Sequence, residues 1–299
     1  MKITVVEVGP RDGLQNEASP VTTADKIAFV DRLSAAGLPV IEVSAFVSPK
    51  WVPQMADAGA VFAGIRRRPG VRYTALAPNL QGLERAAAAR ADDIAIFAAS
   101  SESFSQRNIN QTIGQSLETY AAVSSAARAR GLRVRAYLST AFGCPFEGAV
   151  DPARVATLVA RLLALGAYEV AVSDTIGVAH PAQIRSLLPR IFSDAPGGRV
   201  ALHLHDTRGT ALANVLTAID LGVRTFDASA GGLGGCPYAP GATGNLATED
   251  LMYMLDGLGV ETGVDLDALV NASLFIEEKV GHALPSRVLQ ARKRSTYGV

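Results

Sequence analysis

The chain has 299 residues and can bury a large core, because 48% of them are hydrophobic and only 19% are charged. Its 28 Lys and Arg residues balance its 28 Asp and Glu residues, so no net charge attracts it to nucleic acid or to an anionic membrane. This length suits two ordinary domains or one large barrel.

Short runs rich in Val, Ile, Ala and Tyr alternate with longer segments of helical periodicity. The predicted strands, in chain order, are Ile3–Val8, Val40–Ala45, Arg72–Leu76, Asp93–Phe97, Arg133–Ser139, Glu169–Ser173, Val200–His205 and Thr225–Ala228. The clearest predicted helices are Thr23–Ala36, Ser116–Arg130, Pro152–Leu165 and Leu212–Leu221, which are followed by Gly37, Gly131, Gly166 and Gly222. Glycine at such positions is typical of a helix end.

Eight strands separated by helices predict an α/β protein of the TIM barrel type, a (β/α)₈ fold. No linker divides the chain, so we expect residues 1–299 to form a single catalytic domain. The residues after about position 260 are predicted to form a C-terminal helical extension.

Features of the whole chain predict a cytoplasmic protein. The first residues enter a strand-like run without a signal peptide, and no apolar run is long enough for a membrane span. The two cysteines, Cys144 and Cys236, are too few for a disulfide scaffold and are consistent with a reducing compartment. Cys144 has no basic neighbour in the sequence, and we expect it to be structural.

Polar residues gather at the carboxyl ends of the predicted strands and in the loops that follow them. In a barrel these ends form one face, so residues distant in sequence converge there. The candidates are Arg11, Asp12, Glu42, Arg135, Asp174, His203, His205, Cys236 and Asn245. We predict that they line one pocket.

His203 and His205 lie two residues apart on a predicted strand, so both imidazoles share one face. Asp12 follows the first strand and Asn245 the eighth, and both strands neighbour the seventh in a closed barrel. Two imidazoles, one carboxylate and one amide oxygen favour Mg²⁺ or Mn²⁺ over structural zinc. The structural alternatives are core histidines, a turn residue at Asp12 and a helix N-cap at Asn245.

Four glycines in the seven residues 231–237 predict a mobile loop, and a lid fits better than a phosphate site because the P-loop spacing is absent. Cys236 lies on this loop. A free thiol has a pKa of about 8.5, which favours a proton donor over a nucleophile at neutral pH. An inert small side chain is the alternative.

Four charged residues complete the candidate pocket. Arg11 would place a positive charge beside the metal ligands, where it suits an enolate oxygen. Glu42 and Asp174 suit either a general base or support of the metal ligands, and support is favoured for Glu42. Arg135 lies inside a strand, where an ion pair with an acid such as Glu42 and a substrate anchor both remain open.

Several motifs resemble those of the hydroxymethylglutaryl-CoA lyase family, a branch of the metal-dependent lyase and aldolase barrels. They occupy residues 8–17 (VGPRDGLQNE), 46–57 (FVSPKWVPQMAD), 143–145 (GCP), 174–178 (DTIGV) and 203–207 (HLHDT). The most specific is GGLGGCPYAPGATGN at residues 231–245.

The resemblance implies retro-Claisen cleavage of 3-hydroxy-3-methylglutaryl-CoA to acetyl-CoA and acetoacetate, as in leucine catabolism. It implies that Asp12, His203, His205 and Asn245 hold the metal, Arg11 steadies the enolate and Cys236 takes part in its protonation. Glu42 and Asp174 match further site acids, and Gln15 and Arg135 are predicted substrate contacts. A homodimer that binds an acyl-CoA is the implied assembly.

Two departures from the family pattern, at Arg208-Gly209-Thr210 and at Ala179-His180, leave the acyl group open. A lyase for a longer 3-hydroxy-3-alkylglutaryl-CoA is therefore an alternative. A Claisen condensing enzyme or a pyruvate aldolase is less favoured because of the cysteine loop. A non-enzymatic scaffold is the remaining class.

Overall fold

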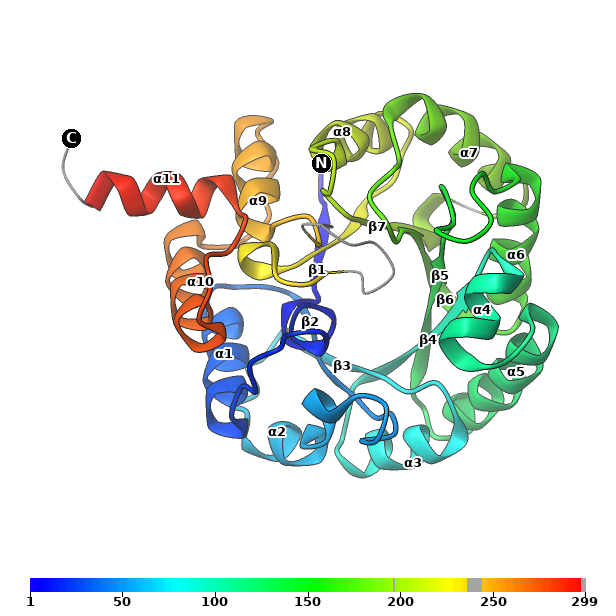
Figure 1. Cartoon of the computed structure of the whole chain (residues 1–299), viewed down its shortest axis with the longest axis horizontal. Helices are drawn as coiled ribbons and strands as arrows, with labels where there is room; N and C mark the ends of the chain where they lie inside the picture. The colour runs from blue at the N-terminus through cyan, green and yellow to red at the C-terminus, as the bar shows by residue number, and fades with distance from the viewer. Residues whose placement is uncertain (196, 236–243, 297–299) are drawn as a thin grey trace.

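Eight parallel strands close into a barrel in chain order, with β1 paired to β8 (Figure 1). The computed structural model describes residues 1–195, 197–235 and 244–296. The strands are β1 (Thr4–Glu7), β2 (Val40–Ala45), β3 (Arg72–Leu76), β4 (Asp93–Ala99), β5 (Arg133–Ser139), β6 (Ala167–Asp174), β7 (Val200–Leu204) and β8 (Thr225–Ala228). The predicted TIM barrel is confirmed.

Helices surround the barrel on its outer side (Figure 1). They are α1 (Thr23–Ala35), α2 (Ala58–Gly64), α3 (Leu80–Ala88), α4 (Glu102–Ile109), α5 (Ile113–Ala129), α6 (Pro152–Ala164), α7 (Pro181–Asp194), α8 (Ala211–Asp220) and α9 (Thr248–Gly257). The predicted C-terminal extension consists of α10 (Leu266–Val280), which packs against α1, and α11 (Arg287–Thr296), which contacts α9. No helix in the described ranges is both long and apolar enough to cross a membrane.

Short helical turns lie in the connections between strands and helices. They are η1 (Gly9–Gly13), η2 (Pro53–Met55), η3 (Gly197–Arg199) and η4 (Ala230–Gly232). The glycines predicted to end helices all have positive φ, namely +89° at Gly37, +74° at Gly131, +101° at Gly166 and +103° at Gly222. Each position therefore demands the left-handed conformation that glycine adopts without strain.

The predicted bounds of four strands differ from the structure. The first strand is shorter at both ends, the fourth continues to Ala99, and the sixth runs from Ala167 to Asp174. The seventh ends at Leu204, because His205 leaves the ladder and forms an isolated bridge with Asn245. That bridge joins the end of β7 to the segment that follows β8.

Candidate metal centre

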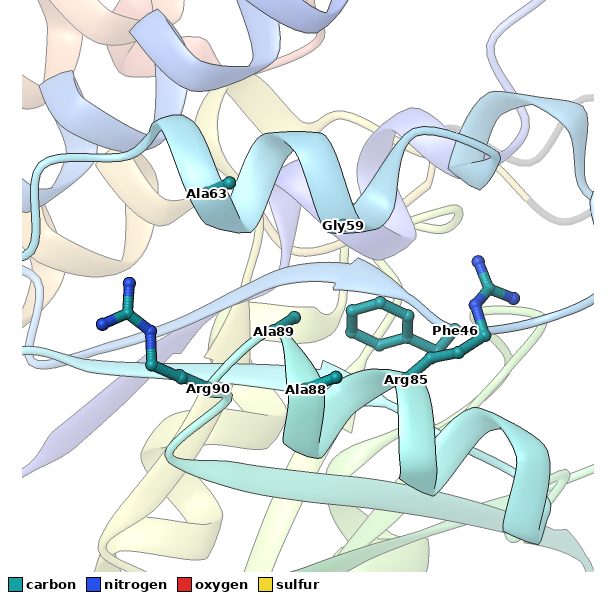
Figure 2. Close-up of a pocket in the computed structure, with 7 residues that line it drawn as sticks. All are labelled: Phe46, Gly59, Ala63, Arg85, Ala88, Ala89 and Arg90. Atoms are coloured by element: carbon teal, nitrogen blue, oxygen red, sulfur yellow. The ribbon is translucent and has the colours of Figure 1, made fainter.

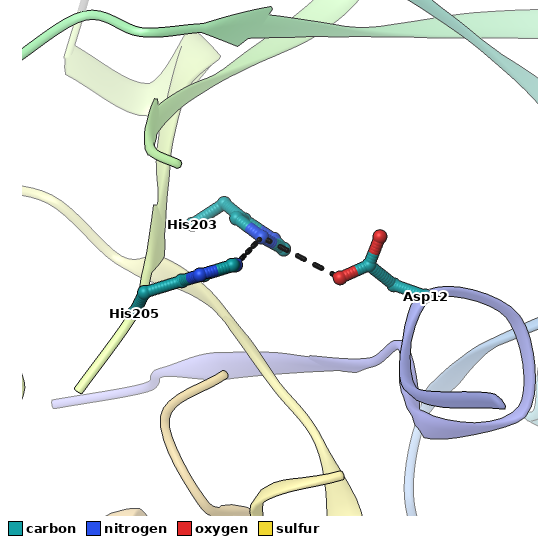
Figure 3. A group of neighbouring side chains, drawn as sticks. All are labelled: Asp12, His203 and His205. Carbon is teal, nitrogen blue, oxygen red and sulfur yellow. Dashed lines mark hydrogen bonds and ion pairs between the residues drawn. The ribbon is translucent and has the colours of Figure 1, made fainter. Parts of the chain in front are cut away.

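Asp12, His203 and His205 converge at the carboxyl-terminal mouth of the barrel (Figure 3). One potential ligand atom from each of the three lies within 4.8 Å of the others. The Nε2 atoms of the two histidines are 3.3 Å apart, and Nε2 of His203 is 3.9 Å from Oδ2 of Asp12. Two imidazoles and a carboxylate pointing at one place form a potential metal-binding group.

Asn245 joins this group from the segment after β8. Its Nδ2 donates hydrogen bonds to Oδ2 of Asp12 at 2.9 Å and to the carbonyl of Leu233 at 3.1 Å. Helix α9 begins at Thr248 with Ala247 as its N-cap, so the alternative that Asn245 caps this helix is wrong. Asn245 instead forms a backbone bridge with His205, three residues before the helix begins, and its side chain contacts Asp12.

The charge states of this group suit a bound cation. Burial opposes ionisation of Asp12, but Arg11 and the two imidazoles outweigh it and hold the pKa of Asp12 below its usual range. Burial and the neighbouring His203 lower the pKa of His205 to about 4. At neutral pH the carboxylate is therefore ionised and the His205 imidazole is neutral, as metal ligands must be.

Arg11 lies directly beside the metal-binding group, on turn η1. Its Nε donates to Oε2 of Glu42 at 2.5 Å, and its Nη1 donates to Oδ1 of Asp12 at 2.5 Å. The guanidinium also lies over the ring of Tyr137, 5.3 Å from the centroid. Arg11 is only 6% exposed, so three neighbours fix a buried positive charge next to the candidate ligands.

The structure assigns Arg135 other partners than the expected Glu42. Its Nε donates to Oε2 of Glu169 at 2.8 Å, and its Nη1 and Nη2 donate to Asp227 at 3.1 and 2.7 Å. Glu42 is occupied by Arg11, which comes from the neighbouring strand loop. Arg135 therefore forms the ion pair with an acid that was one of its two alternatives, although the acids are Glu169 and Asp227 and not the example Glu42, while its role as a substrate contact stays a prediction.

Asp174 lies at the end of β6 and is buried. Its two carboxylate oxygens accept hydrogen bonds from the backbone N–H groups of Val178 and Ala179, each at 2.9 Å. This carboxylate holds the loop after β6. Gln15 is half-buried just past η1, beside Arg11 and Asp12 in the chain.

The start of the glycine-rich segment forms a hydrogen-bonded turn. Ala230–Gly232 form the buried turn η4, and the backbone N–H groups of Ala230 and Gly231 donate to the carboxylates of Glu7 and Glu249. Gly231 and Gly232 therefore belong to a hydrogen-bonded turn, because two buried acids bind its amides, and the mobility of the segment stays a prediction. Cys236 lies outside the described residues.

Three residues near the site were not singled out from the sequence. Tyr137 donates to Oε2 of Glu42 at 3.2 Å, Asp227 binds both Arg135 and His203, and Glu7 holds η4. Each is a polar side chain inside an otherwise apolar strand. That signal was present in the sequence, since buried polar groups in strands require partners.

Two concave surfaces lie outside the metal-binding group. A groove of about 350 Å³ between α2 and α3 has Phe46, Arg85, Arg90 and four small residues in its lining, none of them a predicted site residue (Figure 2). A second, of about 260 Å³, lies between Gly232–Gly234 and the turn at His282. Leu233 on its wall accepts the hydrogen bond from Asn245, so this hollow adjoins the candidate metal centre.

The fold and the site define a (β/α)₈ barrel with a candidate metal centre at its carboxyl-terminal mouth. A family model described as HMGL-like matches residues 2–276. The chain therefore belongs to the HMGL-like family.

Individual relatives are similar over nearly their whole length. The 3-hydroxy-3-isohexenylglutaryl-CoA/hydroxy-methylglutaryl-CoA lyase of Pseudomonas aeruginosa is 54% identical, over 97% of each chain. The crystal structure of a hydroxymethylglutaryl-CoA lyase from Pseudomonas aeruginosa matches with a TM-score of 0.96 and 53% identity, over 98% of each chain. A lyase from A. baumannii in complex with coenzyme A and 3-methylmalate matches with a TM-score of 0.93 and 39% identity, over 97% of this chain and 95% of that one.

Proposed function

We propose that this chain is a divalent-metal-dependent carbon–carbon lyase that cleaves 3-hydroxy-3-methylglutaryl-CoA to acetyl-CoA and acetoacetate. The observation that carries the proposal is the convergence of Asp12, His203 and His205 beside the buried Arg11. Support comes from relatives that are about half identical and are named as lyases of this substrate class. The relative solved with coenzyme A supports an acyl-CoA as the ligand class.

The proposed cation is Mg²⁺ or Mn²⁺, held by Asp12, His203, His205 and Asn245. Carboxylate, imidazole and amide donors without a thiolate suit these ions. The Asn245 amide nitrogen faces Asp12, and rotation of the amide would present its oxygen to the same place. When bound, the cation acts as a Lewis acid that polarises substrate oxygens.

Arg11 stabilises the charge that develops during bond cleavage. Loss of the hydroxyl proton converts C3 of the substrate into the ketone of acetoacetate, while the electron pair of the C2–C3 bond moves toward the thioester. The negative charge on the thioester oxygen then meets a guanidinium already fixed by Glu42 and Asp12. Such preorganised charge needs no rearrangement in the transition state.

The proton transfers are assigned to Glu42 and Cys236. Both oxygens of Asp174 already accept backbone hydrogen bonds, whereas Oε1 of Glu42 has no partner among the described residues. Glu42 is therefore the better-placed acceptor of the hydroxyl proton, besides holding Arg11. Cys236 would return a proton to C2 of the acetyl group, in keeping with the protonated state of an ordinary thiol.

A longer 3-hydroxy-3-alkylglutaryl-CoA is the second candidate substrate. The Pseudomonas aeruginosa relative carries an isohexenyl substrate in its name beside the methyl one. This chain is 54% identical to that protein, so we propose to test cleavage of both the methyl and the isohexenyl substrate.

A cytoplasmic homodimer is proposed as the working form, and light scattering of the purified protein would measure the oligomeric state.

The test is a product assay with a panel of 3-hydroxy-3-alkylglutaryl-CoA thioesters under saturating Mn²⁺. We expect acetyl-CoA and acetoacetate from the methyl substrate, and Asp12→Ala should abolish their formation without unfolding the protein. Absence of cleavage with every thioester contradicts the proposal. Condensation of acetyl-CoA with a 2-oxo acid would instead identify a Claisen condensing enzyme.

A further inference from the structure

We propose that Asp227 is a positioning residue that fixes His203 for cation binding, and that Arg135 serves as the counter-ion of Asp227 rather than as a substrate contact. The inference rests on the proposed metal site. It assigns a role to the buried charge pair of Asp227 and Arg135 inside the barrel. Of the three candidate ligands, His203 is the one that contacts this pair.

The register of the barrel places Asp227 beside His203. The two residues are direct partners across strands β7 and β8, so their side chains lie on the same face of the sheet. Nδ1 of His203 is 3.2 Å from Oδ2 of Asp227, while Nε2 of the same ring faces His205 and Asp12 (Figure 3). The imidazole thus bridges the buried acid and the candidate metal centre.

This hydrogen bond fixes which ring nitrogen carries the proton. An ionised carboxylate can only accept, so Nδ1 of His203 must be the N–H that donates to Asp227. In the neutral imidazole that binds a cation, Nε2 then carries the lone pair, and this nitrogen points at the place where Asp12 and His205 converge. A metal-binding histidine oriented by a carboxylate on its other nitrogen is a common arrangement in proteins.

Arg135 keeps Asp227 charged at a position that is only 1% exposed. The guanidinium reaches from β5 across the barrel and donates to both Asp227 oxygens, at 2.7 and 3.1 Å. Its Nε is bound to Glu169 at 2.8 Å. All three nitrogens of Arg135 are therefore engaged by carboxylates, which leaves little capacity for a substrate anion and explains a positive charge inside a strand.

His205 provides a contrast within the same site. Its Nδ1 has no hydrogen-bond partner among the described residues, and its Nε2 lies 3.3 Å from Nε2 of His203, so no carboxylate in that part of the chain orients His205 as Asp227 orients His203. The two imidazoles therefore differ in the hydrogen bonds that orient them. His203 is set in advance as a ligand, and His205 adapts when the cation arrives.

The experiment measures Mn²⁺ affinity of the full-length protein by the electron paramagnetic resonance signal of free Mn²⁺. Asp227→Asn replaces one acceptor oxygen by a donor that faces either Arg135 or His203, and we expect a loss of affinity of about 10- to 100-fold. The matched control is Glu169→Gln, which removes the other acid bound to Arg135 without touching His203. It should bind Mn²⁺ within about twofold of the wild type.

A second measurement does not depend on a variant that folds. Nitrogen-15 spectra of the metal-free wild-type protein report the tautomer of His203, and we expect the proton on Nδ1. A proton on Nε2, or equal Mn²⁺ affinities of the wild type and a folded Asp227→Asn variant, overturns the role of Asp227 and leaves the proposed lyase function intact. Wild-type protein that binds no Mn²⁺ contradicts the proposed metal site and this inference together.

Discussion

Arg11 and Glu42 are joined by a hydrogen bond of 2.5 Å from Nε to Oε2, although 31 residues separate them in the sequence. The bond links the turn after β1 to the neighbouring strand β2. Since both side chains are buried, the guanidinium cannot turn toward solvent, and its charge stays beside Asp12. This relationship makes Arg11 a fixed part of the site before any substrate enters.

Replacement of Arg11 tests the value of that fixed charge. Arg11→Met should lower kcat about 100- to 1,000-fold, because the charge that develops on the thioester oxygen loses its partner. Mn²⁺ affinity should change little, since the candidate ligands remain. The control is Arg85→Met in the groove between α2 and α3, which should keep kcat within about twofold of the wild-type value. Wild-type kcat in Arg11→Met would refute the role assigned to this residue.

The two cysteines should respond differently to substitution. Cys236→Ala is expected to lower kcat at least about 100-fold with unchanged stability, as for loss of a general acid. Cys144 is buried, with Sγ 2.9 Å from Oγ of Ser101, so Cys144→Ala should cost about 1 kcal/mol of stability and spare catalysis. Steady-state kinetics and urea unfolding measure both effects. Equal kcat in the two variants would exclude Cys236 as the proton donor.

Glu7 makes the stability of the protein depend on pH. Burial raises its pKa from 4.5 to about 7, even though the carboxylate accepts hydrogen bonds from Gly9, Ala230 and Thr248. The folded state therefore binds this proton more tightly than the unfolded state. The contribution of Glu7 is fully present below pH 4.5, falls as the pH rises toward 7, and then levels off.

Glu7→Gln should remove this contribution while its amide still occupies the same space. From pH 5 to pH 8, the free energy of unfolding of the wild type should fall relative to that of the variant, by about 2 kcal/mol. The exposed Glu278→Gln serves as control and should follow the wild type at every pH. A difference between wild type and Glu7→Gln that stays constant with pH would argue against the raised pKa.

Gly244 should tolerate no side chain. Its φ is +86°, and a Cβ atom there would overlap the backbone carbonyl of Gly234. Because Asn245 follows directly, Gly244→Ala should lower both the melting temperature and the affinity for Mn²⁺. Gly209→Ala is the matched control, since φ is +70° there but no atom lies within 4 Å of the added Cβ. It should cost only the roughly 1–2 kcal/mol of a left-handed alanine. Similar losses in both variants would mean that backbone strain alone, and not contact with Gly234, explains the effect.

Much of the fold could be predicted because its signals are local. Gly37 and Gly166 mark helix ends through their own backbone conformation, and the apolar runs at Val40–Ala45 and Arg133–Ser139 identify strands without knowledge of their neighbours. The convergence of Asp12 with His203 followed from closure of the barrel, which makes β1, β7 and β8 adjacent.

The interior charge pairs could not be assigned in the same way. Arg135 reaches Asp227 across the barrel, from β5 to β8, and sequence order alone does not specify which of several buried acids it meets. Asp227 is visible as a polar residue in a strand of only four residues, but such a short strand does not show which acid, base or imidazole its side chain meets. The sequence pattern predicts His205 inside the strand, because the bridge that takes it out of the ladder depends on Asn245, 40 residues later.

The most direct test of the central claim is the metal requirement of acetoacetate formation from 3-hydroxy-3-methylglutaryl-CoA. Protein freed of divalent cations by a chelator should form no acetoacetate, and added Mg²⁺ or Mn²⁺ should restore its formation in the wild type but not in His203→Ala. Undiminished acetoacetate formation without divalent cations, or full restoration in His203→Ala, would contradict a catalytic metal held by Asp12, His203 and His205.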